Sequence, residues 1–342
     1  MANPRSMTEN STSKIPWSKW HQKLHKELLL KPYLLPQDGF VLVAVSGGQD
    51  SMALLQLIID LQRIYKWRIY VWHGNHSWHN ESKRIAIALK EWCLKKEIKF
   101  YSNEANASSI QTEALARKWR YETLQGIAKT IIADQKRDIT CNILTGHTAS
   151  DRAETLLLNL ARGTDLAGLG TLRIQRKINK KLLLTRPFLI FERNETAQIC
   201  KELDITFWVD PTNKNNNLTR NNIRNLILTK LEKLYPGCSV RMASLAERFQ
   251  NYKDDQKSLA LLAINELKIN KKSLRRTSFI ELSISARATI LTCWFSQIGM
   301  PIISSKTLEE LSIKISQSPC GKRDLPNGWI LEWAKEIILL KK

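Results

Sequence analysis

The chain has 342 residues, and its 53 Lys and Arg residues outnumber its 32 Asp and Glu residues, which gives a formal net charge of +21. A hydrophobic content of 43% and a charged content of 25% are typical of globular proteins and exclude a wholly disordered chain, while the length suggests two domains. The excess of positive charge favours a polyanionic partner, most often nucleic acid, over a basic composition that reflects a biased genome.

Strands and helices are expected to alternate through the first half of the chain. Residues 1–13 are predicted to form a disordered tail, and residues 17–30 carry a helical stripe of Trp and Leu. The apolar run at residues 40–45 is too short for a helix and is typical of a strand buried on both faces. The other expected strands cover residues 68–72, 99–101 and 140–145. The other expected helices cover residues 51–65, 81–97, 111–133 and a segment that begins near residue 150.

This alternation predicts an α/β fold with a doubly wound parallel sheet. In such a sheet, ligands bind beyond the carboxyl ends of the strands. The turns after the first, second and fourth strands are Ser46-Gly47-Gly48, Gly74-Asn75-His76 and Gly146-His147. All three turns fall on the same edge of the sheet, so we expect the active site there.

A second, smaller and mainly helical domain is expected in the C-terminal part of the chain. Residues 213–217 form a polar loop, after which helical stripes continue to about residue 267. We therefore divide the chain into an N-terminal tail and helix at residues 1–37, a catalytic domain at residues 38–218 and a C-terminal domain at residues 219–342.

Membrane proteins and disulfide-stapled or metal-ribbon proteins are not expected. The first fourteen residues lack the apolar core of a signal peptide, and no later stretch reaches the roughly 18 apolar residues of a membrane span. The six cysteines include no C-x-x-C pair, which leaves zinc ribbons and iron–sulfur sites without support. Reduced, mostly buried thiols in a cytoplasmic protein are the expectation.

Residues 46–51 carry the clearest chemical signal, because the sequence Ser-Gly-Gly-Gln-Asp-Ser follows a predicted strand and opens a predicted helix. Two glycines allow a tight turn, and the amides at a helix N-terminus can hold phosphate oxygens. An acid in such a loop makes sense if Mg²⁺ bridges Asp50 to the phosphates. The alternative is a plain strand–helix turn in which Asp50 caps the helix. The loop lacks both the G-K-[ST] and the G-x-G-x-x-G patterns.

The loop resembles the PP-loop of the N-type ATP pyrophosphatases, which split ATP into pyrophosphate and an adenylylated substrate. Further segments resemble the tRNA(Ile)-lysidine synthetase family of this fold. They are residues 146–155 (G-H-T-A-S-D-R-A-E-T) with 162–163 (R-G), 113–121 (E-A-L-A-R-K-W-R-Y), 186–187 (R-P), 208–213 (W-V-D-P-T-N) and 220–224 (R-N-N-I-R). The segments occur in the family's order, and the resemblance covers residues 38–235.

The resemblance implies roles for individual residues. Catalysis falls to Asp50, His147, Asp151 and Glu154, with lysine bound by Asp151 and Glu154 and Mg²⁺ by Asp50. The implied ATP contacts are Ser46, Gly47, Gly48, Gln49, Asp50, Ser51, His76 and Gly146. The implied phosphate or tRNA contacts are Arg117, Arg120, Arg162, Arg186, Arg220 and Arg224.

Spacing leaves simpler explanations open for several of these residues. Asp151 and Glu154 are three positions apart and share one helix face, where they can hold an ammonium group, Mg²⁺ or a proton. They can also merely favour the helix dipole. Arg117 can bind an anion or pair with Glu113. His76 can contact the nucleotide or be a core histidine.

The resemblance implies a ligase reaction in two steps. ATP adenylates the C2 oxygen of the wobble cytidine in the CAU anticodon of tRNA(Ile), and the ε-amine of free L-lysine then displaces AMP to form lysidine, which changes decoding from AUG to AUA. The implied partners are ATP, Mg²⁺, free L-lysine and tRNA(Ile), with a homodimer left open. One rival is a tRNA 2-thiolation enzyme, which would use paired cysteines. Another is a small-molecule amidotransferase or NAD-synthetase-like enzyme, which would not need the charge of +21. The third is a non-catalytic RNA-binding protein with an inactive loop, against which Asp50, Asp151 and Glu154 argue.

Departures from the family pattern and two basic stretches remain to be explained. Thr148 stands in place of a histidine, Ser150 in place of an aspartate and Arg152 in place of a glutamine. Between Asp165 and Glu192 the chain has no acid and six cations: Arg173, Arg176, Lys177, Lys180, Lys181 and Arg186. They indicate either a solvated hairpin or an edge that follows a phosphate backbone. The same alternatives apply to a second cluster: Lys271, Lys272, Arg275 and Arg276.

Overall fold

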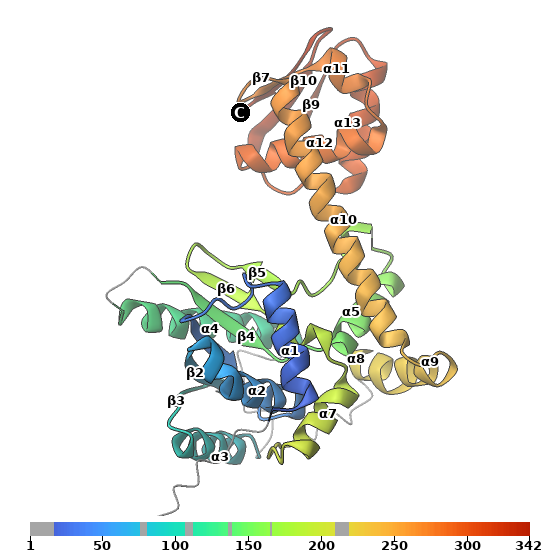
Figure 1. The fold of residues 1–342 in the computed structure, drawn as a ribbon. Coiled ribbons are helices and arrows are strands. Elements are labelled where there is room, and N and C mark those ends of the chain that lie inside the picture. The colour runs from blue at the N-terminus through green and yellow to red at the C-terminus, as the bar shows by residue number, and fades with distance from the viewer. Residues whose placement is uncertain (1–16, 76–80, 107–111, 136–138, 165, 209–218) are drawn as a thin grey trace, which may run out of the picture. The chain divides into compact units, whose positions relative to one another are not determined.

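The structure is a computed structural model that describes residues 17–75, 81–106, 112–135, 139–164, 166–208 and 219–342 (Figure 1). The chain packs as two compact units, residues 1–247 and 248–342. Each unit has its own sheet and its own apolar core.

The sheet of the first unit has six strands in the order β3-β2-β1-β4-β6-β5. Their bounds are β1 Phe40–Ala44, β2 Arg68–Asn75, β3 Lys99–Glu104, β4 Cys141–Thr145, β5 Gln175–Lys177 and β6 Leu182–Thr185. All neighbours are parallel except β5, which pairs antiparallel with β6 at one edge. The expected doubly wound parallel sheet is therefore confirmed, with one antiparallel edge strand in addition.

Helices cover both faces of this sheet (Figure 1). Successive residues of β1 alternate between the faces: Val41 and Val43 belong to a core with α1, α2, α3 and α7, whereas Phe40 and Leu42 belong to a core with α4. The bounds of these helices are α1 Lys19–Leu30, α2 Gln49–Tyr65, α3 Glu81–Lys95, α4 Glu113–Ala133 and α7 Arg193–Glu202. The continuous apolar run at residues 40–45 follows from burial on both sides.

The expected elements up to residue 150 are present with small shifts at their ends. Helix α1 begins after Ser18, whose side chain accepts from the amide of Trp20. Strand β2 continues through Gly74 and Asn75, which the sequence analysis placed in a turn. Helix α5, Ala149–Ala161, begins at the block expected near residue 150.

The segment between residues 166 and 202 holds elements that were not predicted: α6 Leu166–Leu169, β5, β6, η2 Pro187–Ile190 and α7. The helical stripes expected after residue 217 are present as α8 Thr219–Asn222, the π-helical turn η4 Ile223–Leu228 and α9 Thr229–Leu234. Ile223 and Leu228 pack against Ala153 of α5. The boundary that we expected after residue 218 thus lies inside the first compact unit.

The second unit combines helices with a separate antiparallel sheet in the order β7-β8-β11-β10-β9. The strands are β7 Lys268–Asn270, β8 Ser273–Arg275, β9 Gly321–Leu325, β10 Trp329–Trp333 and β11 Ile337–Lys341. The helices are α10 Cys238–Leu267, which begins in the first unit, α11 Arg276–Ile280, α12 Ile284–Ile298 and α13 Ser305–Gln317. The expectation of a mainly helical region omitted this sheet, because its strands are only three to five residues long.

Candidate active site

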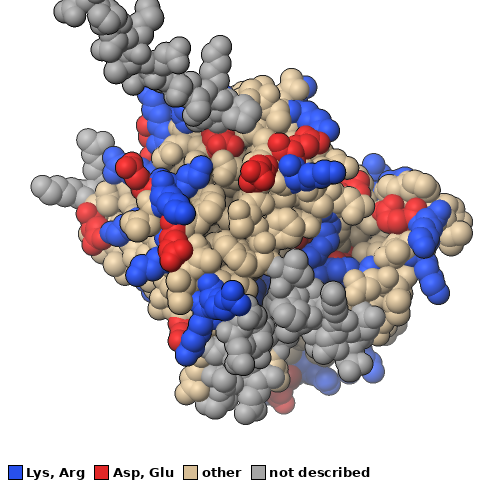
Figure 2. All heavy atoms as spheres, turned by 90° about the horizontal axis from the view of Figure 1, so that it is seen from below, with Lys and Arg blue, Asp and Glu red and all other residues tan. Residues whose placement is uncertain are grey.

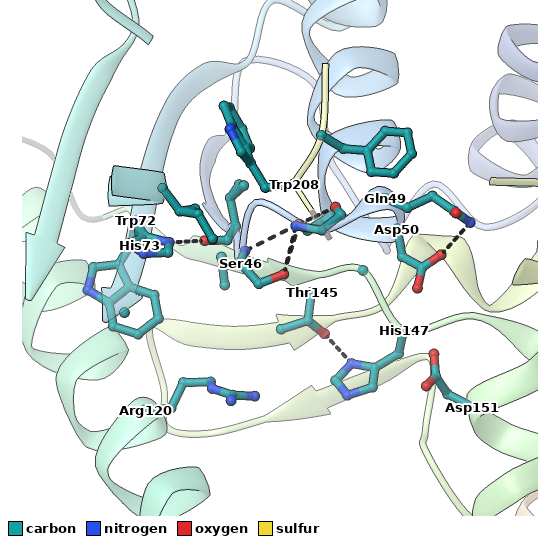
Figure 3. Close-up of a pocket in the computed structure, with 18 of the residues that line it drawn as sticks. Ser46, Gln49, Asp50, Trp72, His73, Arg120, Thr145, His147, Asp151 and Trp208 are labelled. Atoms are coloured by element: carbon teal, nitrogen blue, oxygen red, sulfur yellow. Dashed lines mark hydrogen bonds between the residues drawn. The ribbon is translucent and has the colours of Figure 1, made fainter. Parts of the chain in front are cut away.

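A cavity of about 490 Å³ opens at the carboxyl ends of β1, β2 and β4 (Figure 3). Side chains from the loops after these strands surround it, as expected for a doubly wound sheet. Eleven residues that the sequence analysis singled out line the cavity: Ser46, Gly48, Gln49, Asp50, Ser51, Arg120, Gly146, His147, Asp151, Arg220 and Arg224. Segments separated by more than 100 residues in the chain therefore meet in one site.

Close backbone contacts hold the loop at residues 46–51 in place. Gly47 has a φ of +87°, and a Cβ atom there would lie 2.7 Å from Cγ2 of Ile85. A Cβ atom on Gly146 would lie 3.0 Å from the backbone of Asp50. Glycine is favoured at residue 47 by the positive φ and at residue 146 because a side chain there would press against the backbone of the 46–51 loop.

Helix α2 begins at this loop without a side-chain cap. Gly48 is the N-cap residue, and Asp50 is the second residue of the helix. The amide of Ser46 donates to Oγ of Ser51 at 3.2 Å, and Oγ of Ser51 donates to the carbonyl of Gly48 at 2.9 Å. The structure thus differs from the plain turn with Asp50 as the cap, and it leaves the N-terminus of α2 at the cavity.

Asp50 is held from the side by helix α7. The hydroxyl of Thr196 donates to Oδ1 of Asp50 at 2.5 Å, and Nη1 of Arg193 lies 3.7 Å from Oδ2. Nε2 of Gln49 donates to Oγ1 of Thr196 at 2.7 Å. Burial raises the pKa of Asp50, and it outweighs the opposing effects of Arg193 and Thr196. Arg193 and Thr196 therefore compensate only in part for the burial of the Asp50 charge.

Helix α5 starts with a capping box that fixes Asp151. The amide and hydroxyl of Thr148 donate to Oδ2 of Asp151 at 2.8 and 3.0 Å. Burial acts to raise the pKa of Asp151, but Arg220, Arg224 and the Thr148 amide together hold it below its ordinary value. Asp151 is thus an ionised carboxylate on the cavity wall.

His147 is a neutral side chain in this site. Its Nδ1 lies 2.8 Å from Oγ1 of Thr145, and the ring faces the cavity near Asp151 (Figure 3). Burial lowers the pKa of His147 to about 3, with Arg186 and Arg220 acting in the same direction and Asp151 against them. An uncharged imidazole is therefore present at neutral pH.

Two arginines neutralise the acidic pair on α5. Nε of Arg220 donates to Oε2 of Glu154 at 2.9 Å, and Nε of Arg224 donates to Oε1 of Glu154 at 2.5 Å. An Nη2 atom of each arginine also lies 3.2 Å from Oδ1 of Asp151. Glu154 is 1% exposed and lies behind Asp151, outside the wall of the main cavity. The four side chains form one ion-pair network with no net charge.

A second histidine lines the cavity from β2. His73 is 4% exposed, and its Nδ1–H donates to the carbonyl of Val45 at 2.8 Å. Burial lowers the pKa of His73, against the effect of this hydrogen bond. The neutral ring is therefore fixed as the Nδ1–H tautomer, with Nε2 as an acceptor.

The three departures from the family pattern have structural explanations. Thr148 caps α5, and the hydroxyl of Ser150 accepts from the amide of Arg193 at 3.2 Å. Arg152 is 3% exposed and donates to Glu247 at 3.2 Å and to the carbonyl of Leu172 at 3.0 Å. Arg152 does not line the cavity described above, so its charge serves packing within the first unit.

Four other predicted contact residues, Arg117, Arg162, Arg186 and Gly47, lie outside the cavity wall. Arg186 is 3% exposed and donates to the carbonyl of Arg173 at 2.6 Å. Arg117 is exposed on α4, and Arg162 is exposed at the end of α5. Gly47 supports the loop from behind, where its carbonyl accepts from the amide of Trp208 at 2.9 Å. His76 lies outside the described residues.

Sequence reasoning missed three residues of the site: His73, Arg193 and Thr196. His73 directly follows the strand expected at residues 68–72 and lies inside β2, and nothing in the sequence distinguished it from a core residue. Arg193 and Thr196 belong to α7, a short and polar helix that the sequence analysis did not identify. Their roles follow only from contacts across about 145 residues of chain.

Known proteins resemble this chain over nearly its whole length. Residues 19–231 match the PP-loop domain family. The tRNA(Ile)-lysidine synthases of two strains of Prochlorococcus marinus are 46% and 47% identical, covering 98% and 93% of this chain and 99% and 98% of their own lengths. The chloroplastic tRNA(Ile)-lysidine synthase of Pyropia yezoensis is 34% identical over 62% of this chain and 63% of its own.

A solved structure supports the fold. The U34-tRNA thiolase NcsA from Methanococcus maripaludis, solved with its [4Fe-4S] cluster, has a TM-score of 0.51 and 20% sequence identity. The superposition covers 68% of this chain and 77% of that chain.

Proposed function

The chain belongs to the tRNA(Ile)-lysidine synthase family, and from this premise we propose how its cavity performs the ATP-dependent ligation. The observation that carries the proposal is the meeting of the loop at residues 46–51 with His147 and Asp151 in one cavity. The substrates are ATP, free L-lysine and tRNA(Ile) with a CAU anticodon, and the products are lysidine, AMP and pyrophosphate.

ATP would bind with its phosphates at the loop. The N-terminus of α2 and the backbone amides there favour negative charge. Arg120 and Arg193 also line the cavity and supply positive charge for the triphosphate and for the pyrophosphate that leaves. Arg220 and Arg224 lie beside them, with their charge balanced by the two acids of α5. The wall on the β2 side includes Trp72, Ile85 and Trp208 and suits the base, with neutral His73 as a hydrogen-bond acceptor.

Asp50 fits the requirements of Mg²⁺. The ion prefers one or two carboxylates together with phosphate oxygens and water. The hydroxyl of Thr196 donates to Oδ1 of Asp50. The other oxygen, Oδ2, has Nη1 of Arg193 as its described partner, at 3.7 Å. The raised pKa of this buried carboxylate also favours a cation beside it. Mg²⁺ held by Asp50 would screen the charge of the triphosphate.

In the first step, the C2 oxygen of the wobble cytidine attacks the α-phosphorus of ATP. A bond forms between this oxygen and phosphorus, and the bond to pyrophosphate breaks. The step turns a pyrimidine carbonyl oxygen, which cannot leave unaided, into the oxygen of an adenylate. The arginines around the cavity stabilise the charge that develops on the departing pyrophosphate.

In the second step, the ε-nitrogen of lysine attacks C2, and the bond between C2 and the adenylate oxygen breaks to release AMP. The ammonium must first lose a proton. We assign Asp151 to hold the ammonium and pass its proton to solvent, since Asp151 is the acid of the pair that lines the cavity. Arg220 and Arg224 each lie 3.2 Å from Oδ1 of Asp151 and hold this carboxylate in place. Glu154 positions these arginines.

The setting of the reaction follows from its substrates. Because tRNA, ATP and free lysine meet in the cytoplasm, we place the reaction there. None of the helices in the described part of the chain is both long and apolar enough to cross a membrane.

The test is ATP-dependent incorporation of labelled lysine into tRNA(Ile) with a CAU anticodon. The wild-type protein should incorporate lysine into this tRNA and not into tRNA(Met). Asp50→Ala and Asp151→Ala should abolish incorporation, whereas Asp255→Ala, which removes an exposed acid of α10, should not change it. No incorporation by the wild-type protein would overturn the function. Wild-type rates in both site variants would overturn only the assignment of residues.

A further inference from the structure

The antiparallel edge of the first sheet is unusually basic. Strands β5 and β6 form a hairpin in which five exposed cations follow one another: Arg173, Arg176, Lys177, Lys180 and Lys181. No acid occurs between residues 166 and 191. On the molecular face shown in Figure 2, by contrast, Lys and Arg are interspersed with Asp and Glu. The hairpin therefore concentrates one sign of charge.

Tyr121 connects this hairpin to the cavity. It projects from α4 and lines the cavity together with Arg120. The guanidinium carbon of Arg176 lies 5.6 Å from the centre of the Tyr121 ring, and that of Arg117 lies 5.2 Å from it. A continuous path of positive and aromatic side chains thus runs from the cavity wall to the sheet edge.

The arginines on this path repel one another. Burial lowers the pKa of Arg186, and the like charges of Arg117 and Arg176 lower it further, while Tyr121 acts against them. In the described part of the chain, no carboxylate makes an ion pair with Arg117 or Arg176. Like charges that lie close together are stabilised when an anion binds.

Two purely structural explanations, a solvated hairpin and a protected edge strand, account for only part of this arrangement. A solvated hairpin needs polar residues but not a cluster of one charge. An edge strand is protected from aggregation by a single lysine or two, and this does not explain arginines that flank a cavity-lining tyrosine. Arg186, by contrast, has a structural use, because it donates to the carbonyl of Arg173.

We propose that the β5–β6 hairpin and Arg117 bind the phosphodiester backbone of the RNA strand whose target base enters the cavity past Tyr121. The proposal rests on the proposed function, and it names the surface along which the substrate RNA approaches. Arginine and aromatic side chains next to one another suit an RNA loop, whose bases are unstacked and whose phosphates are exposed.

The test compares two double variants with the same change in charge. Arg176→Glu with Lys180→Glu reverses the hairpin, and Lys90→Glu with Lys95→Glu reverses two exposed lysines of α3, which packs against β3 at the opposite edge of the sheet. Binding of tRNA(Ile) and of ATP is measured separately at equilibrium, together with lysine incorporation. We expect the hairpin variant to bind the tRNA at least tenfold more weakly, with unchanged ATP binding, and the α3 variant to resemble wild type.

A neutral variant measures how many RNA phosphates the hairpin binds. Arg176→Gln with Lys180→Gln should reduce the slope of log K against log salt by about 0.7–0.9 for each phosphate that the variant no longer neutralises. Equal weakening by the hairpin and α3 variants, or unchanged tRNA binding by the hairpin variant, would overturn the proposal. Either outcome leaves lysine incorporation by the wild-type protein intact, so failure of this proposal is distinct from failure of the proposed function.

Discussion

The hydroxyl of Thr196 lies 2.5 Å from Oδ1 of Asp50, although 146 residues separate them in the chain. Thr196 is fully buried, and its oxygen also accepts from Nε2 of Gln49 at 2.7 Å. Helix α7 thus fixes the rotamer of the acid that we assign to Mg²⁺. The relationship makes Thr196 a positioning residue for the loop at residues 46–51.

Thr196→Val should therefore impair the reaction while the fold remains intact, because valine keeps the shape and removes the hydroxyl. The loss of one hydrogen bond to a charged group, about 1.5–3 kcal/mol, predicts a decrease in kcat of at least about tenfold. Since this hydrogen bond lowers the pKa of Asp50, the acid limb of the pH–rate profile should move to higher pH. Thr196→Ser should restore both, and a wild-type profile in Thr196→Val would contradict the assignment.

Asp50→Asn and Asp151→Asn should change stability in opposite directions. Burial raises the pKa of Asp50, so its ionised form destabilises the fold at neutral pH, and this effect vanishes as the pH falls through the raised pKa. The depressed pKa of Asp151 means that its charge stabilises the fold above its unfolded pKa, and that this stabilisation is lost as the pH falls through the folded pKa.

At pH 7 we therefore expect Asp50→Asn to raise the free energy of unfolding by up to about 1 kcal/mol. Asp151→Asn should lower it by about 2–4 kcal/mol, since Arg220 and Arg224 lose a partner. Urea unfolding of the two variants measures the difference. Changes of the same sign would refute the opposite pKa shifts.

The sequence was most informative where chemistry and periodicity coincide. The glycines of residues 46–51 and the following apolar stripe predicted both the loop and helix α2, and the order of the strands placed His147 and Asp151 on the same edge. The Thr148 cap shows why α5 begins where it was expected. Local rules were sufficient for these elements.

Pairings across the chain could not be predicted in this way. Asp151 and Glu154 were interpreted as a pair on one helix face, but spacing could not reveal that Arg220 and Arg224, at least 66 residues away, neutralise them. Strands of three and four residues, such as β5 and β6, are too short to show a periodicity. The hairpin therefore remained ambiguous until Arg176 was found against Tyr121.

His147 should remain neutral across the physiological pH range. Burial lowers its pKa to about 3 from the ordinary value of 6.5. The folded state therefore binds this proton less readily than the unfolded state, so stability is complete above about pH 6.5 and is lost as the pH falls toward 3. The imidazole resonance, assigned by its absence from a His147→Asn variant, should not titrate between about pH 5 and 8. A midpoint in that range would contradict the burial of an uncharged ring.

The neighbours Arg275 and Arg276 have opposite surroundings in the second unit. Arg276 is 6% exposed, and it donates to the carbonyls of Ile315 at 2.9 Å and Ser318 at 2.8 Å. Arg275 and Lys271 are exposed. The basic cluster of the sequence therefore divides into a structural arginine and a charged surface.

Lys271→Glu with Arg275→Glu should weaken binding of tRNA(Ile) by about tenfold or more without changing ATP binding, because reversed charges repel the phosphate backbone. Arg276→Ala is the matched contrast: it removes the guanidinium donor from the carbonyls of Ile315, Lys335 and Ser318, and it should destabilise the second unit by about 2–4 kcal/mol. Equilibrium tRNA binding over a range of salt concentrations, together with thermal unfolding, separates the two effects. If the double variant binds tRNA as tightly as wild type at every salt concentration, Lys271 and Arg275 are solvated surface residues and the RNA contacts lie elsewhere.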